Sequence, residues 1–480
     1  MATKSSKLNA DRRVMLLEGP IGRSLLTLAV PITLANILQT GYQLTDAFWV
    51  GRLGAAAVAA VAVSFPVTFL LIALGSGLGI AGATLSAQYM GAGRQDMVDH
   101  VAGQTMVMVA ITSTVLGGAG FVMAPTLLRM MHVAPDVSAD ALGFMRVSFV
   151  GVVFVFGYAM FQALMRGVGE TRIPLLIVLG TVLLNFLLDP LFIFGWGPVP
   201  AEGVKGAAIA TLVTQAIAVA IAVFIFVRGR HGIHMRWSAL KPDLAYIKRA
   251  FVLGVPGSIE LSTRGLGLVV LSFFAASFGT LTTAAYGVGS SILQVVMIPA
   301  MGVSMAVSTL VGQNIGAGKP ERASRAALLG AGVSFAGLTL AGVFAYFFAP
   351  YIAAFFVPHD AGVIAESAKF VRTMCLAWGL IGIQFCFIAV FRACGKMVMA
   401  MTIALLSQWA VQFPLVYGLS KHTGLHADGL WWSFPATNLV GAAISAVCFI
   451  AGGWKAKRLT EDEALTVRVT EEEIVEEGLR

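Results

Sequence analysis

Charged residues are scarce in this sequence of 480 residues, where Asp, Glu, Lys and Arg together make up 12%. Soluble proteins usually carry about 25%. Hydrophobic residues make up 58%, and the mean hydropathy is +0.85. This balance excludes an ordinary soluble domain, because long apolar runs with few charges are typical of helices that cross a bilayer. The sequence therefore predicts an all-α protein that crosses the membrane many times.

Cysteine is also rare, and enzyme motifs are missing. The four cysteines form no C-x-x-C pair, so we expect neither a metal site nor a disulfide framework. There is no G-x-x-x-x-G-K-[ST], H-E-x-x-H or G-x-S-x-G pattern, which argues against ATPase, metallopeptidase and hydrolase chemistry. A membrane-embedded transferase or sensor would need a catalytic dyad or a large soluble domain. We therefore expect no enzyme activity and no cofactor, with His100, His132 and His422 in solvated loops.

The apolar runs predict twelve membrane-spanning helices joined by short polar turns. The expected ranges are 24–48, 55–88, 98–124, 138–165, 172–195, 204–228, 248–276, 281–312, 323–348, 363–391, 397–419 and 428–453. Lys and Arg gather in alternate connections, above all in 228–249, which places both termini in the cytoplasm of a bacterial-type inner (plasma) membrane. The basic excess thus indicates topology and not a nucleic-acid partner, and we expect a monomer in the lipid bilayer.

The two halves of the chain repeat at a constant spacing. Pro31 recurs 225 positions later as Pro256, and the pattern Q-x-x-G-A-G-[RK] occurs once in each half at the same offset. Each half holds an even number of spans, so the repeat is parallel and predicts two pseudo-symmetric six-helix bundles around a central cavity. The expected domains are a cytoplasmic segment at 1–23, a bundle at 24–228, a cytoplasmic linker at 229–247, a second bundle at 248–453 and an acidic cytoplasmic tail at 454–480.

Carboxylates inside the expected spans are rare and commonly mark ion or proton pathways. Those that lie well inside the spans, away from the helix ends, are Asp46, Asp189 and Glu260. Asn185 precedes Asp189 by four residues and lies on the same helix face, while Pro190 leaves the carbonyl group of Phe186 without its usual donor. Such oxygen atoms suit Na⁺, or a carboxyl group that takes up a proton. The alternative is that Asp189 faces solvent at the helix end.

The first span carries a polar stripe. The residues on this helix face are Asn36, Gln39, Gln43 and Asp46, with Tyr42 at its edge. A polar stripe costs free energy against lipid, so we expect it to face water, an ion or a substrate, with Gln162 of the fourth span as a further cavity candidate. Pro31 interrupts the hydrogen bonds of this helix and is the expected hinge. Asp46 could instead pair with Arg52 at the helix end.

The seventh span contains a possible secondary ion pair. Glu260 and Arg264 lie four residues apart, a spacing that predicts a mutual ion pair; a second coupling site is the alternative. The positions that match Asp46 and Asp189 in the repeat are Leu271 and Leu415. We therefore expect ion coupling to be confined to the first half of the chain.

These motifs resemble those of the multidrug and toxic compound extrusion (MATE) family, and most of all its DinF-type branch. The resemblance rests on Pro31, D-A-F-W-V-G around Asp46, the doubled Q-x-x-G-A-G-[RK] and N-F-L-L-D-P-L-F-I-F around Asp189, and it extends to about residue 455. It implies that Asp46, Asn185 and Asp189 form one cation or proton site. Thr211 matches the threonine of the sixth helix that completes this site.

The resemblance also implies a secondary transporter that exports amphipathic or cationic drugs in exchange for H⁺ or Na⁺. The NorM-type branch has an acid nine residues after the proline of the seventh helix and another in the tenth. Here Gly265 holds the first position and 379–390 contains no acid, which argues against coupling through the second half. The alternative is a lipid-linked oligosaccharide or polyisoprenoid flippase of the same superfamily. That function would need several cationic side chains in the cavity, where only Arg264 lies deep within a span.

Overall fold

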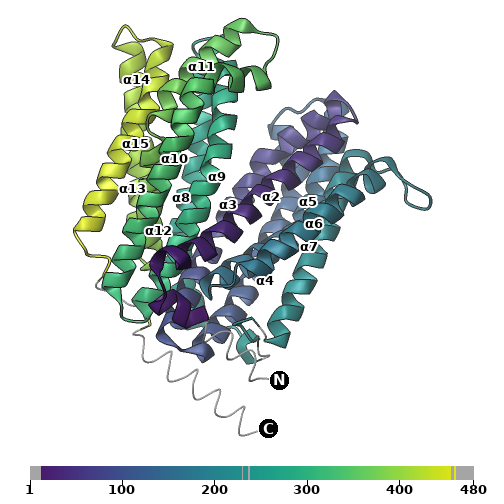
Figure 1. Ribbon diagram of the computed structural model, residues 1–480. Helices are drawn as coiled ribbons and strands as arrows, with labels where there is room; N and C mark the ends of the chain where they lie inside the picture. Colours follow the sequence, from purple (N-terminus) through teal and green to yellow (C-terminus); the bar gives the residue numbers. More distant parts are fainter. Residues whose placement is uncertain (1–11, 230, 236–237, 456–458, 461–480) are drawn as a thin grey trace. The chain divides into compact units, whose positions relative to one another are not determined.

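The computed structural model describes residues 12–229, 231–235, 238–455 and 459–460, so the predicted acidic tail lies almost entirely outside the described residues. In the described ranges the protein is helical, and extended structure is limited to one bridge between Trp196 and Val199. The elements (Figure 1) are α2 (Ile21–Gly51), α3 (Ala55–Ala92), α4 (Gln95–Met130), α5 (Pro135–Gly167), α6 (Arg172–Phe194), α7 (Gly203–Arg228), η1 (Ser238–Leu240), α8 (Leu244–Ala276), α9 (Thr280–Gly316), α10 (Pro320–Phe356), α11 (Ala361–Cys375), α12 (Trp378–Ala393), α13 (Met397–Leu405), η2 (Leu406–Gln412), α14 (Phe413–Lys421) and α15 (Ala427–Ile450).

The prediction of twelve spans is confirmed within the described part of the chain. Eleven stretches are long and apolar enough to cross a membrane, and α11 with α12 forms a twelfth that is bent by 50°. Several helices are longer than predicted. The helix α10 continues through Pro350 to Phe356, because Ala349 and Ala353 on its next turn are buried in the core. Tertiary packing thus outweighs the local effect of the proline.

Two spans of the second half depart from a straight α-helix. At the α11–α12 bend, a Cβ atom on Gly342 of α10 would lie 2.7 Å from the carbonyl oxygen of Cys375, so α10 packs directly against the backbone there. In the span Met397–Lys421, η2 is a π-helix. The side chain of Gln408 in η2 fills the space that a side chain on Gly267 of α8 would need. Neither departure is visible in the hydrophobic pattern, because both depend on neighbouring helices.

The sequence repeat has a matching repeat in backbone conformation. Gly93, after α3, and Gly318, after α9, have φ angles of 77° and 73°. In both turns the following residue donates its N–H to the carbonyl group five positions earlier, at 3.0 Å and 2.8 Å. Glycine adopts this left-handed conformation without steric cost, so it ends helices in this way. The doubled G-A-G-[RK] pattern therefore encodes the same helix ending twice.

The chain divides into two compact units. Unit 1 contains Leu34–Ser258, and unit 2 contains Gly19–Thr33 and Ile259–Leu459. The division falls inside α2 and inside α8. Each division point lies two residues beyond a proline, Pro31 in α2 and Pro256 in α8. The repeated prolines thus mark the places where each helix passes from one unit to the other.

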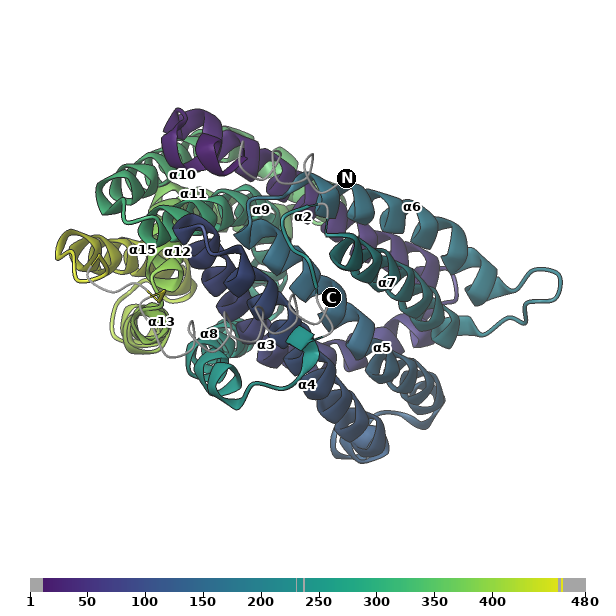
Figure 2. The ribbon, with the colours of Figure 1, turned by 90° about the horizontal axis from the view of Figure 1, so that it is seen from below.

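Unit 1 is organised around α5, which packs against α3, α4 and α7. Viewed end on in Figure 2, α4, α5 and α7 are neighbours. Small residues allow this close packing: a Cβ atom on Gly117 of α4 would lie 2.5 Å from the carbonyl oxygen of Phe149 in α5. Such contacts are typical of helices that associate in lipid. The arrangement leaves α6 packed chiefly on α7.

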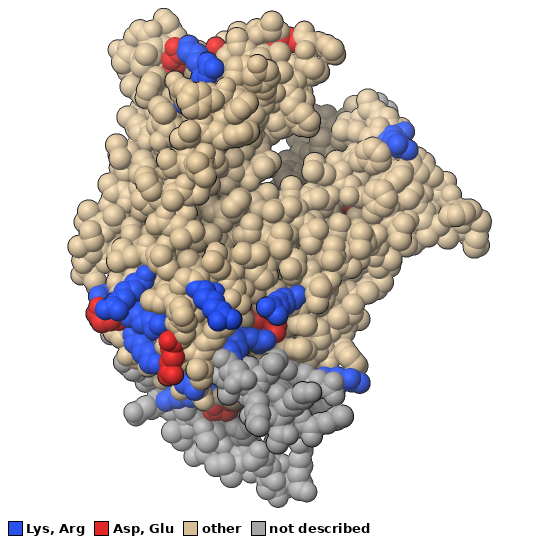
Figure 3. All heavy atoms as spheres, viewed as in Figure 1, with Lys and Arg blue, Asp and Glu red and all other residues tan. Residues whose placement is uncertain are grey.

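Unit 2 is organised around α10, which packs against α9, α11 and α12. Its core contains stacked aromatic rings, with the Phe370 and Trp431 ring centroids 4.2 Å apart. On the face of unit 2 that Figure 3 shows, charged side chains lie at the two ends, and the surface between them carries none. This distribution is the one expected for a unit embedded in a bilayer.

The segment before α8 folds onto α4, and here one prediction is wrong. His100 lies on α4, is 7% exposed, and its Nε2 atom is 3.2 Å from a carboxylate oxygen of Asp243. Gln104, one turn farther along α4, donates to the carbonyl groups of Ala239 and Lys241. The long-range contact with Asp243 buries His100, and no local pattern reveals it. His132 and His422 are exposed and lie outside the helices, as predicted.

Candidate functional site

The helix α6 presents a buried polar stripe to the interior of unit 1. Thr181, Asn185 and Asp189 follow one another at four-residue intervals and are 5%, 0% and 0% exposed. The Asn185 amide donates to Oδ1 of Asp189 at 3.0 Å, whereas the Thr181 hydroxyl donates to the carbonyl group of Val178 in its own helix. The helix continues through Pro190 and ends at Gly195. Asp189 therefore lies in the protein interior, and the solvent-facing alternative is excluded.

Two further helices bring polar groups to the same place. The Thr211 hydroxyl of α7 donates to Oδ2 of Asp46 in α2 at 3.4 Å. The carboxyl group of Asp46 also interacts with the carboxyl group of Asp189 and with the side chain of Asn185. We call Asp46, Asn185, Asp189 and Thr211 the acidic cluster. The four residues predicted for the coupling site thus come together from α2, α6 and α7.

The acidic cluster contains oxygen atoms that are buried and lack a hydrogen-bond partner. They are Oδ1 of Asp46, Oδ1 of Asn185 and Oδ2 of Asp189. Buried polar atoms are normally paired, and two adjacent carboxylates in apolar surroundings repel each other unless a cation or a proton neutralises them. Oxygen-only ligands suit a hard cation. Among the described residues, no group of three or more His, Cys, Asp or Glu side chains could hold a metal ion.

The alternative partner of Asp46 is engaged elsewhere. The guanidinium group of Arg52 lies over the rings of Phe48 and Trp49, at 4.6 Å and 5.1 Å from the centroids. Trp49 in turn packs on Phe186 of α6, with ring centroids 5.8 Å apart. These aromatic contacts hold the second half of α2 against α6. Asp46 is thereby directed to the acidic cluster and not to Arg52.

Tyr42 and Thr214 extend the acidic cluster. Their hydroxyl oxygens are 2.7 Å apart, and both side chains are buried. The Thr214 hydroxyl also lies within 3.0 Å of the carbonyl oxygens of Ala210 and Thr211, to which it can donate. The Tyr42 hydroxyl then donates to Thr214. The sequence did not single out Thr214, although its spacing of three residues from Thr211 places both on one face of α7.

The other stripe residues of α2 are less buried than Tyr42. Gln39 and Gln43 are exposed, while Asn36 is half-buried and its side-chain nitrogen has no hydrogen-bond partner. Gln162 of α5 is half-buried. Pro31 lies inside α2, which is continuous across it. The roles of these residues in a substrate cavity and in a hinge stay predictions.

Unit 2 contains a charged triad that the sequence predicted only in part. Glu260 is 1% exposed and lies 3.3 Å from Arg264, as the spacing predicted. Arg392, at the end of α12, makes two further bonds to the same carboxylate, at 2.5 Å and 3.2 Å. The Arg264 guanidinium group also lies 5.0 Å from the ring centroid of Phe385. Two arginines thus share one glutamate, so Glu260 is engaged in ion pairs on both sides.

Twelve apolar spans, two compact units and two interacting carboxylates, of which Asp189 is fully buried, are the features of a polytopic membrane transporter. A model of the MatE family matches residues 31–191 and 258–417. The chain belongs to this family, and it is accordingly a multi-pass membrane transporter and not an enzyme.

The chain matches several characterised or named proteins over nearly their whole length. It is 28% identical to the probable multidrug resistance protein YoeA of Bacillus subtilis (strain 168), over 92% of this chain and 96% of that protein. It is 26% identical to the FAD transporter of Shewanella oneidensis, over 88% and 93%. A crystal structure of MATE in the straight conformation matches 92% of this chain and 99% of its own, with a TM-score of 0.86 and 23% identity. That likeness supports the fold.

Proposed function

We propose that this protein exports amphipathic or cationic compounds by alternating access, in exchange for H⁺ or Na⁺. The observation that carries this proposal is the group of three unpaired oxygen atoms on Asp46, Asn185 and Asp189, buried within apolar spans. A site of this kind binds a cation or a proton at a gain in free energy, because the repulsion between two carboxylates is relieved. The multidrug resistance protein YoeA, which is similar over most of the chain, supports the choice of substrate class.

In the mechanism that we propose, binding of the cation to the acidic cluster alternates with binding of the drug to its cavity. The cation enters from outside and neutralises Asp46 and Asp189. Neutralisation removes the electrostatic reason for the second half of α2 to remain hydrated, so α2 bends at Pro31 and the drug is expelled. The division of α2 between the two units just after Pro31 supports a joint at this position. Coupling is reciprocal, so drug entering from the cytoplasm favours release of the cation.

The substrate surface that we propose combines amide side chains with apolar walls. Gln39 and Gln43 are exposed on α2, and Asn36 and Gln162 are half-buried. Amide groups bind cationic or neutral drugs without fixing a single geometry. We further propose that the protein acts as a monomer in the inner membrane with both termini in the cytoplasm, as the distribution of Lys and Arg indicates.

The efflux assay that tests this function uses purified protein in liposomes loaded with ethidium, with a Na⁺ gradient and a pH gradient imposed separately. We expect one of these gradients to drive ethidium across the membrane in the direction opposite to the flow of the ion. Ethidium transport should stop when an ionophore collapses that gradient. The responding gradient identifies the ion. Ethidium that moves under neither gradient, or that moves equally without one, would contradict the proposal.

Replacing Pro31 by Ala is expected to slow export and to raise thermal stability together. A proline in a helix interior costs about 3 kcal/mol relative to alanine, so the variant stiffens α2 in one conformation. Pro66→Ala is the matched control, since Pro66 is exposed inside α3 and has no proposed hinge role. The hinge role is tested by melting curves and ethidium efflux measured on both variants. Efflux at the wild-type rate by Pro31→Ala would contradict a hinge at Pro31.

A flippase for a lipid-linked oligosaccharide or polyisoprenoid is the second candidate. The observation that favours it is the triad of unit 2, where two cationic side chains, Arg264 and Arg392, contact the single carboxylate of Glu260. Arginine side chains are the groups that typically bind phosphate. The same liposomes, loaded with a fluorescent polyisoprenyl pyrophosphate, distinguish the two functions. We expect no translocation of this lipid under the ion gradient that drives ethidium.

A further inference from the structure

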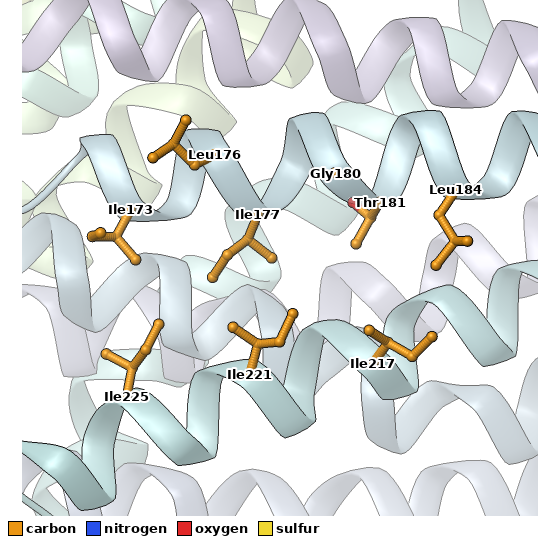
Figure 4. Close-up of a pocket in the computed structure, with 9 residues that line it drawn as sticks. All are labelled: Ile173, Leu176, Ile177, Gly180, Thr181, Leu184, Ile217, Ile221 and Ile225. Carbon is orange, nitrogen blue, oxygen red and sulfur yellow. The ribbon is translucent and has the colours of Figure 1, made fainter.

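An apolar groove runs between α6 and α7 in unit 1. It has a volume of about 410 Å³ and is lined by six residues of α6 and three of α7 (Figure 4). All of them are apolar except Thr181, whose hydroxyl donates to the carbonyl group of Val178. Leu176, Ile217 and Ile221 are 60%, 40% and 40% exposed. The groove is therefore open along its length, and its lining suits a hydrocarbon chain.

The length of the groove matches one leaflet of a bilayer. It extends from Ile173 and Ile225 at one end to Leu184 and Ile217 at the other (Figure 4). Eleven helical steps from Ile173 to Leu184 correspond to about 16 Å, roughly half of the 30 Å hydrocarbon core. A single acyl chain that enters at the Ile173 end would therefore reach about the middle of the membrane.

Two arginines flank the Ile173 end. Arg172 is the first residue of α6 and Arg228 the last of α7, and both are exposed. Arg228 follows Ile225 by three residues and so lies on the same face of α7, with its guanidinium group 4.4 Å from the ring centroid of Phe224. Among the described residues, neither arginine forms an ion pair with an acid. The topology predicted from the basic residues places this end at the cytoplasmic surface.

The one acid close to this end in the sequence is already engaged. Glu170 accepts hydrogen bonds from the backbone N–H groups of Arg172 and Ile173, and its other oxygen pairs with Arg12. The positive charge of Arg172 and Arg228 therefore remains available to a ligand. Basic groups next to a groove between membrane-spanning helices are a recognised arrangement for anionic lipid headgroups.

We propose that an anionic phospholipid of the cytoplasmic leaflet binds here, with one acyl chain in the groove and its phosphate group between Arg172 and Arg228. The far end of that chain contacts Thr181 and Leu184. Leu184 directly precedes Asn185, so the lipid would support the turn of α6 that carries the acidic cluster. The bound lipid fixes α6 against α7, which together supply three of the four members of the cluster.

The test measures binding of phosphatidylglycerol to the purified full-length protein by native mass spectrometry, with phosphatidylcholine of the same chains and inorganic phosphate as comparison ligands. We expect wild-type protein to retain phosphatidylglycerol in preference to both. Two basic groups at an anionic headgroup correspond to about a 30-fold difference in affinity. The double substitution Arg172→Gln and Arg228→Gln is therefore expected to weaken phosphatidylglycerol binding about 30-fold.

Two further variants separate the groove from general charge effects. Arg129→Gln with Arg146→Gln removes the same charge elsewhere in unit 1 and should leave binding unchanged. Ile221→Trp fills the groove but keeps both arginines, and it should also lose phosphatidylglycerol. Because Ile221 is 40% exposed, this change does not disturb the core. Wild-type binding by the Arg172/Arg228 variant or by Ile221→Trp would overturn the proposal, as would equal retention of phosphatidylcholine by the wild type.

Discussion

Cells that express the Asp189→Asn variant should be as sensitive to exported drugs as cells without the protein. Asp189 is fully buried and receives the amide of Asn185 at 3.0 Å, so asparagine fits the same space. The substitution removes one of two adjacent carboxylates and with it the repulsion that a cation or a proton relieves. Without that difference in binding between states, no gradient can drive export.

The measurement is growth of cells on graded ethidium, together with the amount of protein in the membrane fraction. Asp140→Asn is the matched control, because the same chemical change is made on α5 of the same unit at an exposed position. The control should confer full resistance, and both variants should insert equally. Resistance equal to the wild type in Asp189→Asn cells would show that this carboxylate has no part in coupling.

The Glu260→Gln variant should be strongly destabilised. Glu260 is 1% exposed and bonds to both Arg264 and Arg392, so its neutralisation removes the counter-charge that two half-buried guanidinium groups share. Loss of one member of a buried ion pair typically costs about 3–5 kcal/mol. The cost falls on unit 2, where the carboxylate links α8 to the end of α12.

Thermal melting of the purified protein in detergent measures this effect. Glu321→Gln is the control, since Glu321 is 80% exposed in its pair with Lys455, and such pairs contribute about 1 kcal/mol or less. Replacing Arg392 by Gln in the Glu260→Gln background should recover part of the loss, because the repulsion between the two arginines disappears. A melting temperature of Glu260→Gln equal to that of the wild type would mean that the triad does not stabilise the contact between α8 and α12.

The acidic cluster could be predicted because its chemistry is unusual for a membrane. Carboxylates within apolar spans are rare, and the four-residue spacing of Asn185 and Asp189 fixes their common face without knowledge of the fold. Asp46 was a candidate for the same reason, but its grouping with the α6 pair, and the choice of Thr211, required the resemblance to a family. Nothing local indicates that α2, α6 and α7 meet. The role of their contact in transport stays a prediction that the structure motivates.

The partners of buried charges were harder to predict than the charges themselves. Arg392 lies 132 residues from Glu260, and Asp243 lies 143 residues from His100, so neither pair has a signal in local spacing. The bend between α11 and α12 and the π-helix η2 likewise depend on close approach of α10 and α8. Periodicity reports which face of a helix is apolar, whereas these features depend on which helix covers that face.

Drug affinity measured as a function of cation concentration tests the central claim most directly. The dissociation constant of a fluorescent drug would be determined on purified protein over a range of pH and of Na⁺ concentration, for the wild type and for the Asp46→Asn/Asp189→Asn double variant. Because antiport requires reciprocal coupling, either acidification or Na⁺ should weaken drug binding by the wild type and leave the double variant unaffected. The same cation dependence in both proteins would contradict coupling through the acidic cluster.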